Sequence, residues 1–550
     1  MTTIRRRADP SPSSPPPLLS RLRSAASSIL TRQYSTKKEG DGRRSGGTFS
    51  APRPLRTGFV DPSSWIYFDS RTVGINLDAI PKDAWAVLKK LKRKGFDAYL
   101  VGGCVRDLLL KRVPKDFDVI TTASLQQIKK NIFRGCMIIG RRFPICLLKM
   151  RGSVIEVSSF STVGNYVNRS EEVDFLEELN GYDAGDILRW KNSMRRDFTI
   201  NGLFFNPMNY RIYDYVNGVR DMRKNKVCTV IPAYVSFTED PARILRGLRI
   251  AARLGFQFSS ETSTAMRDLS SSIINIDKAR LMMEMNYMLS YGAAEPSVRL
   301  LRKYGLLDIL LPFQGAYLLD QMKGKSSDKD LMLMKLLANL DRLLSADRPC
   351  HCSLWLALLV FHSALVNSPQ DTLVIRAFAA LLYFGTWKST IKFLKEDVGA
   401  QVSYVPETMG TSQTKLDNLM EQTSHLASLL ISSVRTLTCL DALQKSLARF
   451  PSAPQFSGLV LVSNNDRSRL LRIFEGIDSD LTSNDERRGM HGIDYWSLKD
   501  GHPNEVRFVL GKVILDTMSD ELPCESTEDA AATIKPNLAD GSHPALSTLF

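Results

Sequence analysis

The chain has 550 residues, of which 43% are hydrophobic and 24% charged, and its net charge is +15. This composition is typical of a globular protein with roughly two to four domains. No apolar run approaches the roughly 20 residues that span a bilayer, so no membrane-spanning helix is expected. The basic total favours an anionic partner.

Residues 1–60 differ in composition from the rest of the chain. They hold twelve Lys or Arg and three acidic residues, so this segment carries +9 of the net charge and the remainder only +6. The stretch LLSRLRSAASSILTRQYSTKK can form an amphipathic helix, and it lacks the apolar centre of a secretory signal. We therefore predict an organellar transit peptide, with the mitochondrion favoured over the chloroplast. A disordered basic tail is the alternative.

Short helices and strands alternate from about 61 to 235. The stretch PKDAWAVLKKLKRKG predicts a helix that Pro81 opens and Gly95 stops. Strands are predicted for DAYLVGG, DFDVITT, CMIIG, FPICLLKM and SVIEVSSF, and helices for CVRDLLLKR and SLQQIKKNIF. Residues 163–190 are acidic without periodicity and predict a loop.

The span YLVGGCVRDLLLKRVPKDFDVITTA places a two-glycine turn near two carboxylates. At Gly102 and Gly103 the backbone N–H groups of a helix start can approach a phosphate, and Arg106 adds a cation one turn later. Asp116 and Asp118 share one face of a strand, where they repel unless a cation lies between them. Mg²⁺ prefers such oxygens, so the span predicts a phosphate loop beside a metal site. The alternatives are an unliganded turn and a solvated strand end.

Glu156 is a single acid inside the apolar strand SVIEVSSF. Burying it unpaired costs several kcal/mol, and a neighbouring metal would remove that cost. We therefore consider Glu156 a third carboxylate of the same site. The alternative is that it faces solvent on a one-sided sheet.

Two further clusters favour nucleotide binding. In NSMRRDFTINGLFFNP, the Arg196 guanidinium suits a phosphate, and Asp197 can orient an Arg or hold a ribose hydroxyl. The alternative is a surface Arg pair with a capping Asp. In TEDPARILRGLRIAARLGF, Asp240 and Arg243 open a helix, and an Asp–Arg pair can read a base edge. Its later cations, such as Arg249, fit a solvated basic face.

Helical patterns replace strands after about 236 and continue to about 450, whereas the polar end from about 519 is expected to be disordered. The first histidine is His351, which argues against Ser-His or Cys-His catalysis before it. The pair Cys350 and Cys352 has no partner pair at zinc spacing, so we expect buried free thiols and no structural metal.

The motifs LVGGCVRD…DFDVIT, RRDFTING and EDPARILRGLRIAARLGF, in this order and spacing, resemble those of class II nucleotidyltransferases. That family contains CCA-adding tRNA nucleotidyltransferases and bacterial-type poly(A) polymerases. The resemblance covers about residues 80–310. It implies an α+β fold, in which a nucleotidyltransferase head with a small mixed sheet precedes an all-helical neck, body and tail. The implied segments are a leader (1–60), head (61–235), neck (236–315), RNA-binding body and tail (316–518) and disordered end (519–550).

The resemblance also implies a role for each motif residue and two Mg²⁺ ions, with ATP and an RNA 3′ end as substrates. The implied roles are metal binding and catalysis by Asp116 and Asp118 with Glu156 as a further catalytic acid; triphosphate binding by Gly102, Gly103 and Arg106; contact with the incoming nucleotide by Arg196, Asp197 and Asn201; and base reading by Glu239, Asp240 and Arg243.

The stretch IIGRRFPICLLKM, residues 138–150, resembles the signature of the poly(A) polymerase branch. Together with an organellar leader, it makes the chain similar to plant polynucleotide adenylyltransferase family proteins. The function implied is addition of AMP from ATP to RNA 3′ ends. A CCA-adding enzyme and a catalytically inactive RNA-binding protein are the alternatives. A dinucleotide-binding domain is excluded because no third glycine stands at the required spacing.

Overall fold

The computed structural model describes residues 62–140, 144–150, 153–162, 182–323, 327–396, 402–409, 418–477, 481 and 492–519. All of them belong to one compact unit of the chain. The predicted leader lies outside the described residues, as do nearly all of the predicted disordered end and residues 141–143 of the branch signature.

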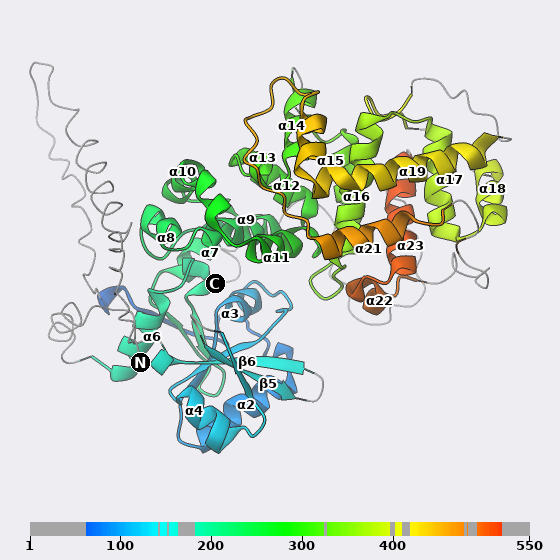
Figure 1. Ribbon diagram of the computed structural model, residues 1–550. Helices are drawn as coiled ribbons and strands as arrows, with labels where there is room; N and C mark the ends of the chain where they lie inside the picture. Colours follow the sequence, from blue (N-terminus) through cyan, green and yellow to red (C-terminus); the bar gives the residue numbers. More distant parts are fainter. Residues whose placement is uncertain are drawn as a thin grey trace, which may run out of the picture. The chain divides into compact units, whose positions relative to one another are not determined.

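The described part of the head is built on a mixed sheet of eight strands (Figure 1). The strands are β1 (Ile66–Asp69), β2 (Ala98–Val101), β3 (Asp118–Thr121), β4 (Met137–Ile139), β5 (Ile145–Met150), β6 (Ser153–Ser159), β7 (Phe204–Asn206) and β8 (Arg211–Asp214). Their order is β1-β8-β7-β2-β3-β6-β5-β4. Strand β3 is antiparallel to β2 and parallel to β6, and the other neighbours are antiparallel.

Both faces of the central strands are buried, because side chains alternate between the faces. Leu100 and Val119 point into the main hydrophobic core. Tyr99 and Ile120, their neighbours in the chain, join a second cluster rich in aromatic rings. Strand β2 is fully buried, which explains its continuous apolar sequence AYLV. Gly102 follows directly after the strand.

The helices and turns of the head confirm most of the predicted elements. They are η1 (Pro62–Ser64), η2 (Leu77–Ala79), α2 (Lys82–Arg93), α3 (Gly103–Leu109), α4 (Leu125–Gln127), η3 (Ile128–Ile132), α6 (Ala184–Ser193), η5 (Thr199–Asn201) and α7 (Gly218–Arg223). The predicted loop over 163–190 is wrong at its end, because α6 begins there with the Asp183 side chain accepting from Asp186 N–H. The preceding residues 163–181 lie outside the described part of the chain.

Helices make up almost all of the described chain after the head, as predicted (Figure 1). They are α8 (Ala233–Glu239), α9 (Ala242–Leu254), α10 (Ser260–Asp268), η6 (Ser270–Asn275), α11 (Lys278–Leu289), α12 (Ala294–Lys303), α13 (Leu307–Leu310), α14 (Pro312–Gln321), α15 (Met332–Leu343), α16 (Cys352–Asn367), α17 (Thr372–Phe384), α18 (Trp387–Glu396), α19 (Leu419–Thr438), α20 (Leu440–Leu447), α21 (Asn464–Phe474), α22 (Tyr495–Asp500) and α23 (Pro503–Met518). The predicted α+β class, a mixed sheet followed by helices, is confirmed.

One short strand contradicts the expectation that strands stop after residue 236. Strand β10 (Gln257–Phe258) pairs in parallel with β9 (Lys226–Val227). It follows α9 directly, where Gly255 adopts a left-handed conformation that ends the helix. The pairing fastens the end of α9 to the head.

Helix α16 is buried along nearly its whole length, and the apolar α17 packs in the same core. Among the described residues, no single helix has both the length and the apolar character needed to cross a membrane. Helices α19 and α20 pass that test only as a pair, with a bend of 102° between them.

Candidate active site

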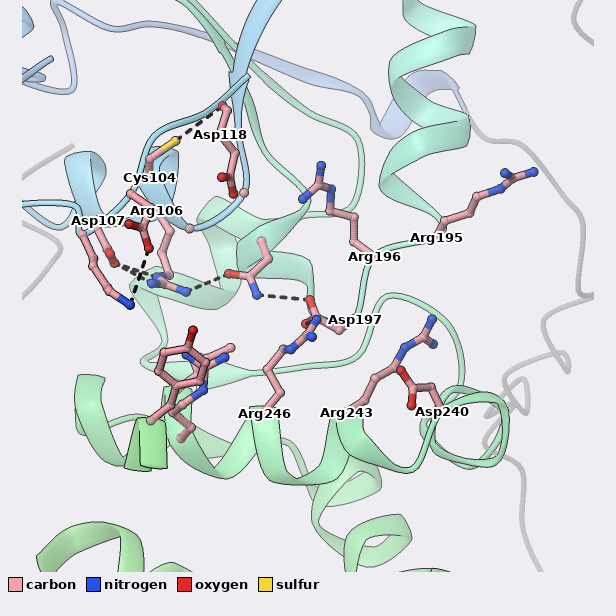
Figure 2. Close-up of a pocket in the computed structure, with 18 of the residues that line it drawn as sticks. Cys104, Arg106, Asp107, Asp118, Arg195, Arg196, Asp197, Asp240, Arg243 and Arg246 are labelled. Atoms are coloured by element: carbon pink, nitrogen blue, oxygen red, sulfur yellow. Dashed lines mark hydrogen bonds and ion pairs between the residues drawn. The ribbon is translucent and has the colours of Figure 1, made fainter. Parts of the chain in front are cut away.

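A cavity of about 1040 Å³ brings residues of the head together with residues of α9 and α11. Of the residues that the sequence singles out, its lining includes Gly102, Gly103, Arg106, Asp116, Asp118, Arg196, Asp197, Asn201, Glu239, Asp240 and Arg243. Glu156 is not part of the lining, and it is exposed, so the premise that it is buried inside an apolar strand is wrong and the solvent-facing alternative describes its exposure. Segments more than 100 residues apart in the sequence thus converge on one space (Figure 2).

The two-glycine turn joins β2 to α3. Gly102 has φ +80° and ψ −135°, a conformation that side chains with a Cβ rarely adopt. A Cβ at this position would also lie 3.0 Å from Nη1 of Arg196. Gly102 therefore serves two purposes, since it permits the turn and lets a guanidinium approach the backbone closely.

Arg106 is engaged within the protein. Its Nε and Nη2 donate to Asp107 Oδ1 at 2.8 and 2.7 Å, and its Nη1 donates to Asn201 Oδ1 at 2.7 Å. Only 7% of its surface is exposed. This guanidinium holds the α3 turn against η5, and its contact with a triphosphate stays a prediction.

Three carboxylates gather where β3 begins. Asp118 is the first residue of β3, and Glu156 is its register partner on β6. Asp116 precedes the strand rather than belonging to it, and 66% of its side chain is exposed. Burial, Glu156 and Asp116 together raise the pKa of Asp118 to about 6, against the opposing effect of Arg196. Burial and Asp116 also raise the pKa of Glu156, although Lys115 opposes them.

The raised pKa values bear on metal binding, because they mean that negative charge at this point is costly. A divalent cation between the carboxylates would remove that cost. Asp116 and Asp118, which line the cavity, supply the hard oxygen atoms that Mg²⁺ prefers. Within the described ranges no group of three or more His, Cys, Asp or Glu is arranged so that it could hold a metal ion by itself. Asp116 and Asp118 fit a Mg²⁺ ion whose remaining ligands are phosphate oxygens or water.

Arg196 is a cation whose charge acts on Asp118. Figure 2 shows it between Asp118 and Asp197, whereas Arg195 points elsewhere. Its Nη2 donates to Asn192 Oδ1 at 3.3 Å. Burial lowers the pKa of Arg196, and the two aspartates act against that shift. A half-buried guanidinium beside the glycine turn suits the phosphates of a nucleotide.

Asp197 links the head to α9. Its Oδ1 accepts from Phe198 N–H at 2.8 Å and from Asn201 Nδ2 at 3.1 Å, and its Oδ2 accepts from Arg246 Nη1 at 3.2 Å. Burial raises the pKa of Asp197, but Arg246 and these hydrogen bonds outweigh it, so the pKa lies below its usual value. Asp197 and Asn201 therefore position other residues as well as lining the cavity.

The predicted base-reading residues lie between α8 and α9. Arg243 Nη1 donates to Ser236 Oγ at 2.9 Å and lies 3.3 Å from Glu239 Oε2. Asp240 Oδ2 accepts from Arg280 Nη2 at 2.7 Å. Arg243 and Asp240 thus each have a partner of opposite charge that restricts the orientation of the side chain. Both residues line the cavity.

Sequence reasoning missed the contribution of α11 and of the turn that follows it. Arg280 and Tyr287 on the helix and Tyr291 in the turn all line the cavity, although nothing marked them in advance. The assignment of Arg249 to a solvated face is wrong, because its Nε donates to the buried Glu284 at 3.1 Å and it also lines the cavity.

The Cys350–Cys352 stretch behaves as a packing element. Both thiols are buried and unpaired, as expected, and burial raises the pKa of each to about 12. His351 between them caps α16, where its Nδ1 accepts from Ser353 N–H at 3.1 Å. This stretch lies outside the cavity.

Two protein-family models match the chain. "Poly A polymerase head domain" matches residues 98–228, and "Probable RNA and SrmB- binding site of polymerase A" matches residues 255–318. The first range contains every predicted site residue of the head. The predicted base readers fall between the two ranges.

Curated relatives match over the same part of the chain. Poly(A) polymerase I of Haemophilus influenzae is 36% identical over 250 residues, which are 44% of this chain and 54% of that protein. A CCA-adding enzyme of Staphylococcus epidermidis is 28% identical over 292 residues, 53% of this chain and 63% of that protein. The chain therefore spans about half the length of the poly(A) polymerases it matches.

Solved structures of CCA-adding enzymes also align with the chain. The crystal structure of the Bacillus stearothermophilus CCA-adding enzyme in complex with CTP is 22% identical, with a TM-score of 0.37. The alignment covers 71% of this chain and 81% of that one.

Proposed function

We propose that the chain is a class II nucleotidyltransferase that adds AMP from ATP to RNA 3′ ends without a template, a proposal that the matches to two family models and to the curated relatives support. The observation that carries the proposal is one cavity that both Asp116 and Asp118 and the residues Asp240 and Arg243 line, with Asp118 apart from Asp240 and Arg243 (Figure 2). This arrangement suits a nucleoside triphosphate whose phosphates lie near the carboxylates and whose base lies near the pair.

In the proposed reaction the RNA 3′ hydroxyl oxygen forms a bond to the α-phosphorus of ATP and releases its proton to solvent. The bond from that phosphorus to the bridging oxygen breaks, and pyrophosphate leaves with the bonding electrons. Mg²⁺, bound by Asp116 and Asp118, would supply Lewis-acid stabilisation of the charged oxygens. Arg196 at the Gly102 turn would hold the triphosphate by charge-assisted hydrogen bonds.

Base choice would fall to the readers near α9. An Arg guanidinium donates to ring nitrogen or carbonyl acceptors, and a carboxylate accepts from an exocyclic amine. Adenine and cytosine both carry such an amine. The Arg280 contact to Asp240 and the Glu239 contact to Arg243 limit how these readers can turn.

A CCA-adding enzyme is the second candidate, because such enzymes are also among the relatives. The test supplies a tRNA that lacks its terminal CCA, and separately an unstructured RNA, with CTP or ATP alone. Repeated AMP addition to both RNAs, without CMP addition, is the expected result. Efficient CMP addition to the tRNA would overturn the choice of ATP.

The third alternative, an inactive RNA-binding protein, is tested by the same assay. It predicts that neither nucleotide is incorporated although RNA binds. Loss of incorporation in Asp116→Ala, with RNA binding retained, would support a catalytic metal site. Activity retained in that variant would remove Asp116 from the mechanism.

A further inference from the structure

One face of α11 carries a row of residues that follows the cavity. Arg280, Glu284 and Tyr287 are spaced by four and three residues, so they fall on the same side of α11, and Tyr291 lies in the turn that follows the end of the helix at Leu289. Arg280 meets Asp240 at one end. Tyr287 comes seven residues later, about 10 Å further along the axis at about 1.5 Å per residue. The row therefore extends from the base readers toward another part of the cavity.

The tyrosine end of the row lies beside the carboxylates. Lys115 Nζ is 3.7 Å from Asp116 Oδ2 and 3.5 Å from the hydroxyl oxygen of Tyr291. The same ammonium lies 4.7 Å from the ring centroids of both Tyr287 and Tyr291. One lysine thus touches a predicted metal ligand and both aromatic rings.

The two rings are arranged as an accessible aromatic surface. Their centroids are 5.4 Å apart, at an angle of 49°. Both side chains are half-buried, both line the cavity, and neither belongs to the hydrophobic core or packs against it as a partly buried apolar residue. The Arg249 guanidinium lies 5.0 Å from the Tyr287 ring centroid. Aromatic rings beside cations are the combination that binds single-stranded nucleic acid by stacking and by contact with its backbone.

We propose that Tyr287 and Tyr291 form a stacking platform for the 3′-terminal base of the RNA substrate, with Lys115 contacting the phosphate of that nucleotide. This inference rests on the proposed function, which requires the RNA 3′ oxygen beside Asp116 and Asp118. The terminal base must then lie within one nucleotide of these carboxylates, and the tyrosine rings lie there. Lys115 has a flexible stem, so its ammonium moves from the rings to the phosphate when the base stacks.

The base of the incoming nucleotide is a poorer occupant of this platform. Asp240, one of its proposed readers, contacts Arg280, whose position on α11 is about 10 Å from that of Tyr287 along the helix axis. The two bases would therefore occupy different parts of one cavity. Stacking on a ring accepts any base, whereas hydrogen bonding by Asp240 and Arg243 selects one.

The test measures equilibrium binding of a fluorescent single-stranded RNA to the full chain, without any nucleotide. Tyr287→Ala and Tyr291→Ala should each weaken binding about tenfold, and Tyr→Phe at either position should retain it because the ring remains. Tyr182→Ala is the matched control, since this exposed tyrosine contacts Trp65 and does not line the cavity. Circular dichroism verifies that each variant is folded.

A second RNA, with an abasic ribose at its 3′ end, separates stacking from a structural role. Wild type should lose about tenfold in affinity when the terminal base is removed, and the Ala variants should lose nothing further. The proposal is overturned if the Ala variants bind like wild type, or if the penalty for removing the base is the same in all proteins. Because no nucleotide is present, these results are independent of incorporation; a wild type that stacks the base but incorporates no AMP contradicts the proposed function alone.

Discussion

Replacement of Asp118 by Asn should stabilise the metal-free protein in a pH-dependent way. The pKa of this carboxyl is raised from 3.8 to about 6 in the folded state, so the folded protein favours the neutral form. Below pH 3.8 both states bind the proton, and the carboxylate costs nothing. As pH rises from 3.8 to about 6, the folded state is penalised progressively. A pKa raised by this much corresponds to a loss of about 3 kcal/mol in the free energy of unfolding, and an Asn at this position, which carries no charge, avoids that loss.

The assay is urea unfolding with a chelator present, near pH 8 and again near pH 4. Asp118→Asn should raise the free energy of unfolding by up to about 3 kcal/mol at the higher pH and by almost nothing at the lower one. Adding Mg²⁺ at the higher pH should then stabilise wild type but not the variant. Equal stability of the two proteins near pH 8 would refute the reasoning.

Asp69 offers a control of opposite sign. This exposed carboxyl is hydrogen-bonded by Arg71, which lowers its pKa to about 2. The ionised Asp69 carboxylate therefore stabilises the folded state above pH 3.8, and this stabilisation is lost as the pH falls toward about 2. Asp69→Asn should slightly destabilise the protein at neutral pH, and Mg²⁺ should stabilise it as it does wild type.

Two further substitutions test the geometry around the cavity. Gly102→Ala places a Cβ on a residue with positive φ and against Arg196. We therefore expect a loss of about 2 kcal/mol in unfolding free energy and a raised KM for ATP. Unchanged values would mean that neither stability nor ATP binding needs a glycine at this turn. Arg246→Met leaves the buried Asp197 without its cation and should cost about 2 kcal/mol, discounted for the exposure of Arg246. Adding Asp197→Asn to that variant should recover part of the lost unfolding free energy. If the double variant loses the sum of the two single losses, Arg246 and Asp197 do not stabilise each other.

The sequence predicted the elements that form from local pattern. AYLV and DVIT are apolar strands flanked by turn signals, and the first long helix of the head stops just before Gly95, as expected. Strands β7 and β8 were missed, because three or four residues are too short to establish an alternating pattern. These two strands form because β7 pairs with β2 and β8 pairs with β1, both of which are far away in the sequence.

In the candidate site, too, contacts between residues near in sequence could be predicted, whereas contacts between distant residues could not. Residues of one motif, such as Gly102 with Asp118, could be predicted because a strand, a turn and a second strand bring them together locally. The contacts of Arg246 and Arg280 could not, because their partners Asp197 and Asp240 lie 49 and 40 residues away. The packing of α9 against the head creates the first contact, and the packing of α11 beside the start of α9 creates the second.

The most direct test of the central claim is AMP incorporation into a single-stranded RNA, followed by gel resolution of the 3′ end. Wild type and Asp69→Asn should both extend the RNA with ATP. Asp116→Asn and Asp118→Asn should bind the same RNA but fail to extend it, because both carboxylates are proposed metal ligands. Extension by either variant at the wild-type rate would contradict the assignment of the cavity as a nucleotidyltransferase site.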